Sequence, residues 1–162
     1  MKRYPTYLWI IGCMLLAMQL QAQSYTKKVL TKIPELEKGK VYTLKDLKAA
    51  QLLYPDGVDL DDETVYPFAK ITGRRVVVIL YFRKQRGTEG LHLDATTLRK
   101  KKLQPVHVTR YLCTFGKIGK RVYTSTISMD KKKIVSFNEV ENGKTNTKRY
   151  RLEGKWFSLV SD

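Results

Sequence analysis

The segment RRVVVILYFR, residues 74–83, decides the fold of this chain. Its interior from Val76 to Phe82 is continuously apolar, which predicts a central strand covered on both faces. It is far too short for a membrane-spanning helix. Four basic residues flank the run, and we interpret them as charges that discourage aggregation: Arg74, Arg75, Arg83 and Lys84.

Further β-rich runs follow, separated by turn residues at intervals of about ten, which is the spacing of an antiparallel meander. Asn142-Gly143 and Glu153-Gly154 are expected hairpin turns, since glycine accepts the positive φ that a tight turn requires. In residues 121–129, the alternation of side chains predicts that one face of the strand is more apolar than the other, with Ile127 and Met129 on the more apolar face. The expected strands are VHVTRYLCTF (106–115), RVYTSTISM (121–129), IVSFNEV (134–140), TNTKRYRL (145–152) and KWFSLV (155–160).

Two helical segments are also expected. Thr43-Leu44-Lys45-Asp46 has the form of a capping box, and Leu44, Leu47, Gln51 and Tyr54 then share one side of a short amphipathic helix. Residues 55–57, Pro-Asp-Gly, should end it. The segment DATTLRKKK, residues 94–102, is predicted to form a second short helix with Asp94 as its N-cap.

The sequence therefore predicts an α+β fold that is mainly antiparallel β. We expect a C-terminal meander of about five to six strands, either an open sheet or a partly closed barrel. The short N-terminal helix should pack on this meander.

The first residues, MKRYPTYLWIIGCMLLAMQLQA, have the pattern of an export signal over residues 1–22. Cleavage after Ala22 leaves a lead-in segment, residues 23–42, and a single β-rich domain, residues 43–162. The protein is then periplasmic or secreted. Lipid anchoring is an alternative, since Ile10-Ile11-Gly12-Cys13 matches a bacterial lipobox. An uncleaved anchor is a third option, although the apolar run falls short of a comfortable membrane span.

Positive charge is the main functional signal of the expected domain. The chain has 31 Lys and Arg against 15 Asp and Glu, a formal charge of +16. Adjacent turns could join their cations into one surface for an anionic ligand, with Tyr150 and Trp156 as aromatic contacts. The alternative is a set of solvated turns that keep the protein soluble. The cations proposed to bind are Arg99, Lys100, Lys101, Lys102, Lys131, Lys132, Lys133, Lys148, Arg149 and Arg151.

Metal and cofactor signals are weaker, and no catalytic residue is assigned. Asp59, Asp61 and Glu63 mimic the first positions of a calcium-binding loop, but the pattern then fails, so we expect neither a metal nor a cofactor. Cys113 is the lone cysteine after signal removal and is expected to be a small buried hydrophobe. His92 and Asp94 share a strand face, which is a weak hint of metal binding or acid–base chemistry.

Three functions fit these observations. The leading hypothesis is non-catalytic binding of an envelope protein, a glycan or an anionic lipid surface through a basic face. Export argues against nucleic acid as the partner. The rivals are a small hydrolase whose acid and base come from separated strands, and a small-ligand carrier with a barrel cavity. The sequence leaves the oligomeric state open.

Overall fold

The computed structural model describes residues 27–53, 58–60 and 63–160. The chain divides into two compact units, Met1–Lys32 and Ile33–Asp162. In the first unit the described residues form a short helix, α2 (Lys27–Lys32). Within the described ranges, no helix combines the length and the apolar character needed to cross a bilayer. The expected export signal, Cys13 and the turn at residues 55–57 lie outside the described residues.

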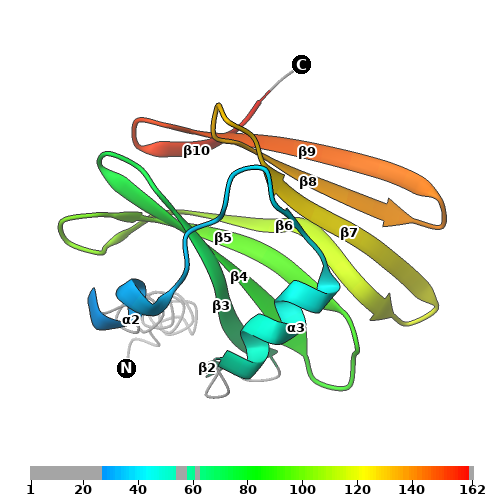
Figure 1. The fold of residues 1–162 in the computed structure, drawn as a ribbon. Coiled ribbons are helices and arrows are strands. Elements are labelled where there is room, and N and C mark those ends of the chain that lie inside the picture. Colours follow the sequence, from blue (N-terminus) through cyan, green and yellow to red (C-terminus); the bar gives the residue numbers. More distant parts are fainter. Residues whose placement is uncertain (1–26, 54–57, 61–62, 161–162) are drawn as a thin grey trace, which may run out of the picture. The chain divides into compact units, whose positions relative to one another are not determined.

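The described part of the second unit contains a ten-stranded sheet, which Figure 1 shows as an antiparallel meander. Strands β2 to β10 are neighbours in chain order, and β1 pairs with β7. No pairing between described residues joins β2 to β10, so the sheet is open, and the predicted mainly antiparallel β fold is confirmed. The strands are β1 (Val41–Tyr42), β2 (Val58–Leu60), β3 (Glu63–Thr72), β4 (Val76–Gln85), β5 (Leu91–Arg99), β6 (Pro105–Ile118), β7 (Arg121–Met129), β8 (Ile134–Glu141), β9 (Lys144–Glu153) and β10 (Trp156–Leu159).

Strand β4 is the covered inner strand that its apolar run predicts. It pairs with β3 on one side and with β5 on the other. All residues from Val76 to Arg83 are buried, so both faces of the strand are shielded from water. One flank differs from our interpretation, because Arg83 is buried whereas Arg74 and Arg75 are exposed.

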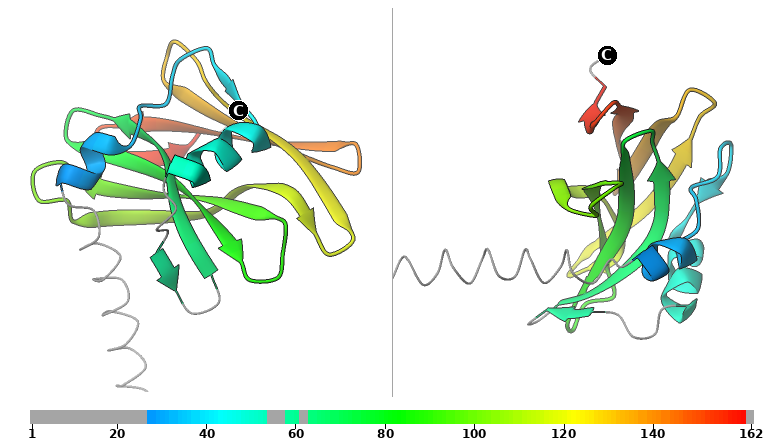
Figure 2. Two further views of the ribbon diagram at one scale, coloured as in Figure 1. Left: turned by 60° about the horizontal axis from the view of Figure 1, so that its bottom comes forward. Right: turned by 90° about the vertical axis from the view of Figure 1, so that its left-hand side faces the viewer.

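Strand β6 links the two halves of the sheet. Its first part pairs with β5, and its end, Gly116–Ile118, pairs with β7. A bulge lies within the part that pairs with β5, where Tyr111 has a φ of 55° and the register with β5 shifts. Bulges bend a strand and increase its twist. Strands β7–β10 accordingly turn away from β2–β5 (Figure 2), and one core cluster contains residues from both halves, including Phe82 and Phe137.

Helix α3 (Leu44–Leu53) begins at the predicted capping box. The backbone N–H of Thr43 donates to Asp46 Oδ2 at 2.8 Å, which caps the first turn. Leu47 and Ala50 are buried and belong to the shared core, so the helix covers the sheet with its apolar side. The mixed α and β packing expected from the sequence is therefore present.

The compact unit begins at Ile33, so part of the segment expected as a lead-in belongs to it. The backbone N–H of Leu36 donates to the carbonyl of Lys70 on β3 at 2.8 Å. Strand β1 then pairs with β7. These residues add hydrogen bonds to strands in both halves of the sheet.

The predicted second helix over residues 94–102 is wrong. Residues 91–99 form β5, which is paired along its length with β4 and β6. Backbone pairing on both sides outweighs a weak local preference for helix. Asp94 is consequently not a helix cap but a fully buried side chain on a central strand.

Strand β3 was not anticipated from the sequence. Its pairing with β4 shifts register between Pro67 and Ala69. This irregularity interrupts the alternation of buried and exposed side chains, which is the main sequence signal of a strand.

Candidate functional site

Three turns of the sheet surround one hollow of about 630 Å³. They join β3 to β4, β5 to β6 and β9 to β10, and Figure 1 shows them at the same end of these strands. Seven lining side chains are basic, and none of the described lining side chains is acidic. We call this hollow the basic pocket; it is lined by Arg74, Arg75, Val76, Arg99, Lys100, Lys101, Lys102, Val106, Lys155 and Trp156.

Contacts outside the charged groups hold the three turns together. The backbone N–H of Lys100 donates to the carbonyl of Arg75 at 3.0 Å, which joins two of the turns. A Cβ added to Gly73 would lie 2.7 Å from Leu152 Cδ2, so the end of β9 packs closely on the β3–β4 turn. The frame of the basic pocket therefore rests on backbone bonding and packing.

The cations of the basic pocket form no ion pair with another described residue. Trp156 is 57% exposed beside them. Clustered cations without counter-ions create a local positive potential that attracts anions.

The structure brings together one predicted cluster and one predicted aromatic residue. Arg99 and Lys100–Lys102 lie on the β5–β6 turn, and Trp156 begins β10 on the opposite side of the same hollow. Sequence analysis missed Arg74, Arg75 and Lys155 as site residues. The two arginines were interpreted only as flanks of β4, although their charge was visible.

The other predicted cations lie elsewhere. The β7–β8 turn carries Lys131, Lys132 and Lys133, and none of them lines the basic pocket. On β9, Lys148 Nζ donates to the carbonyl of Tyr111 at 2.7 Å, and Arg151 pairs with Glu153 at 3.1 Å. Arg149 on the same strand also has an interaction. Tyr150 stacks on Phe157 with ring centroids 5.0 Å apart, so this half-buried ring contributes to packing.

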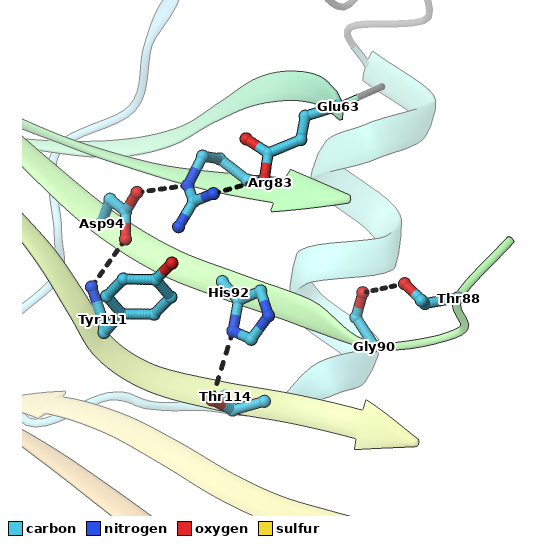
Figure 3. Close-up of polar contacts among 8 residues, drawn as sticks. All are labelled: Glu63, Arg83, Thr88, Gly90, His92, Asp94, Tyr111 and Thr114. Carbon is cyan, nitrogen blue, oxygen red and sulfur yellow. Dashed lines mark hydrogen bonds and ion pairs between the residues drawn. The ribbon is translucent and has the colours of Figure 1, made fainter. Parts of the chain in front are cut away.

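A second charged cluster is centred on Arg83 of β4 (Figure 3). Its Nε donates to Asp94 Oδ2 at 2.5 Å, and its Nη1 donates to Glu63 Oε1 at 2.6 Å. Burial opposes the charge on Arg83, but the bonds to Glu63 and Asp94 outweigh it and raise the pKa above its ordinary value. The guanidinium also lies 5.1 Å from the centroid of the Tyr111 ring. Its Nη2 has no hydrogen-bond partner of acceptable geometry among the described residues.

Asp94 connects this cluster to the bulge of β6. While Oδ2 binds Arg83, Oδ1 accepts a hydrogen bond from the backbone N–H of Tyr111 at 2.8 Å. Both oxygens are thus engaged, and the carboxylate binds the backbone of the one non-glycine residue of β6 that has a positive φ. These two contacts give Asp94 a structural role.

His92 lies beside the same cluster. Its Nδ1 is 3.4 Å from Thr114 Oγ1, and its ring meets the Tyr111 ring edge-on at 5.4 Å between centroids (Figure 3). Burial, followed by the charge of Arg83, lowers the pKa of His92 below its ordinary value of 6.5. The imidazole is therefore neutral at neutral pH.

The remaining sequence predictions concern calcium and cysteine. Asp61 lies outside the described residues, while Glu63 is engaged by Arg83. Among the described residues, no group of three or more His, Cys, Asp or Glu side chains could hold a metal ion. Cys113 is buried, as predicted, and burial raises the pKa of its thiol, so it is not a reactive nucleophile.

Comparison with known proteins adds no family to this description. No protein-family model, curated protein or solved structure matches the chain.

Proposed function

We propose that this chain is an exported binding domain that captures an anionic ligand in the basic pocket without catalysing a reaction. The observation that carries the proposal is the meeting of cationic side chains from three separate turns around one hollow. Export rests on the signal expected in residues 1–22. It favours an anionic group of the cell envelope over nucleic acid as the ligand.

The electrostatics of the pocket support binding more than stability. Like charges held close together repel one another and do not stabilise the fold. An anion entering the pocket relieves this repulsion and gains charge-assisted hydrogen bonds from Arg and Lys. Because backbone contacts already tie the turns together, little backbone conformational entropy is lost on binding.

Two charge-matched triple variants test the proposal by chromatography on immobilised heparin, a soluble sulfated polyanion. The pocket variant combines Arg99→Glu, Lys101→Glu and Lys155→Glu. The control combines Lys117→Glu, Lys120→Glu and Lys144→Glu, which lie in or next to turns at the other ends of β6 and β9. All six side chains are exposed, and both variants change the net charge by the same amount.

The pocket variant should elute at a clearly lower salt concentration than the control, because it has lost cations that act together on the polyanion. Less salt then suffices to screen the attraction that remains. Equal elution of both variants would show that binding follows net charge alone, and the proposed function would then fail.

A hydrolase centred on His92 is the second candidate. One observation favours it: a neutral imidazole lies next to the Thr114 hydroxyl, and a neutral imidazole can act as a general base. Release of nitrophenol from p-nitrophenyl esters, lost in His92→Ala and retained in His107→Ala, would favour this candidate. Equal background rates in the wild type, His92→Ala and His107→Ala would exclude this candidate.

The carrier hypothesis has less support. Large side chains from both halves of the sheet, including Phe82, Phe115 and Phe137, are fully buried in the core. They occupy the interior in which a barrel-type carrier would hold its ligand.

A further inference from the structure

We propose that the ligand of the basic pocket is an anionic phospholipid, held by its negatively charged phosphate group and by the apolar part next to it. This inference rests on the proposed function and names the ligand class of the same site. It follows from the chemistry of the pocket side chains.

Every polar side chain that lines the pocket is a hydrogen-bond donor. Arginine, lysine and the tryptophan indole all donate, and none of these groups accepts. A sugar hydroxyl presents a donor as well as acceptor lone pairs, and its donor would find no acceptor among these side chains. A phosphate diester or sulfate offers only acceptors and carries the opposite charge, so it fits this donor set better.

The remaining lining is apolar. Val106 lies in the hollow with the Trp156 ring and the carbon stems of the long basic side chains, over the buried Val76. Free inorganic phosphate would leave the exposed part of this apolar surface in water. An acyl chain joined to the phosphate through glycerol would cover it and gain free energy from its burial.

The position of Trp156 supports the same ligand class. Its ring is more than half exposed at the start of β10, beside Lys155. Tryptophan with neighbouring cations is typical of the interface between water and anionic lipid, where the ring contacts apolar groups and the cations contact phosphate. The basic pocket combines both elements in one hollow.

Three soluble probes separate the contributions to binding in isothermal titration calorimetry. Dihexanoyl phosphatidic acid carries an anionic phosphate and short acyl chains. Glycerol 3-phosphate carries the same phosphate on glycerol without the chains, and dihexanoyl phosphatidylcholine has the chains with a phosphate whose charge is balanced by choline. The wild-type protein should bind phosphatidic acid at least about tenfold more tightly than either other probe.

Two single variants test the apolar contact. Trp156→Ala should weaken the binding of phosphatidic acid far more than that of glycerol 3-phosphate, so that most of the advantage of phosphatidic acid is lost. Leu159→Ala is the matched control, because Leu159 is also exposed on β10 but does not line the pocket. It should bind all three probes like the wild type.

Equal affinity for phosphatidic acid and glycerol 3-phosphate would overturn the phospholipid inference while leaving anion binding intact. Equal affinity for the two lipids would also overturn it, since the net negative charge of the headgroup would then contribute nothing. If heparin binding is also insensitive to the pocket charges, the proposed function itself fails.

Discussion

The two charged regions of the second unit differ in how their charge is balanced. Arg83 is buried, and its guanidinium contacts the carboxylates of Asp94 and Glu63. The basic pocket gathers seven cations at three turns, and none of the described ion pairs neutralises them. Within the described residues, the charge of one region is compensated by ion pairs and the charge of the other is not.

This difference separates a structural role from a binding role. A buried charge that lost its counter-ion would be costly, so the Arg83 cluster must keep its partners and has little charge to offer a ligand. Exposed cations without partners cost less in water and retain their attraction for an anion. The positive pocket is therefore the better candidate for function, and the larger stability effects should arise at Arg83.

The largest effect is expected for Arg83→Met. The substitution leaves Asp94 buried without its counter-ion, which typically costs about 3–5 kcal/mol of unfolding free energy. Urea denaturation measures this cost, with Lys84→Met as the control on the same strand. Arg83→Met combined with Asp94→Leu should recover part of the loss, because no fully buried charge then remains, and Glu63 is partly exposed to water. A single variant as stable as the wild type would contradict the structural role.

Gly73→Ala changes the frame of the basic pocket without changing its charge. The new Cβ would meet Leu152 Cδ2 at 2.7 Å and the carbonyl oxygen of Val76 at 3.2 Å, so the Leu152 side chain must move and the Val76 carbonyl must give way slightly. Such overpacking costs about 1–3 kcal/mol. Thermal denaturation measures the loss, and heparin binding should weaken in the folded protein. Combining Gly73→Ala with Leu152→Ala should restore part of the stability, and unchanged binding would show that turn spacing is unimportant.

A smaller effect is expected from His92 on the pH dependence of stability. Since its folded pKa lies below 6.5, the unfolded chain takes up the proton first, and stability falls as the pH drops from about 7 through the folded pKa. His92→Gln should flatten this part of the curve in denaturation series at pH 7 to 5. The exposed His107 provides the control, and His107→Gln should retain the slope. An unaltered slope in His92→Gln would remove His92 as its cause.

The smallest effect is a change in Tm of opposite sign to that expected at Arg83. Neutralising pocket cations in Arg99→Gln with Lys101→Gln relieves repulsion, so Tm should rise by about 1–3 °C while heparin affinity falls. Differential scanning calorimetry measures the shift. A clear fall in Tm would mean that these cations stabilise the fold as Arg83 does.

Local pattern was sufficient to predict most of the sheet. The apolar run of β4 and the alternation and glycine turns of β6 to β10 identify their strands, and Thr43 with Asp46 identifies the start of α3. Strand β5 was predicted partly as a helix because its pairing with two neighbours is not a local property.

The two charged regions were predictable only in part. Lys100 and Trp156 were selected from the sequence, but their meeting depends on contacts between distant residues, such as Gly73 with Leu152. Arg83 was taken for a surface flank because its counter-ions come from other strands. Charge sign is visible in a sequence, whereas charge compensation depends on tertiary structure.

The most direct test of the account is an NMR titration of the ¹⁵N-labelled protein with dihexanoyl phosphatidic acid. Uncompensated charge at the three turns predicts the largest chemical-shift changes at the amides of Arg75 and Lys100 and at the indole N–H of Trp156. Shifts centred on His92 and Tyr111, or spread evenly over all basic turns, would contradict it.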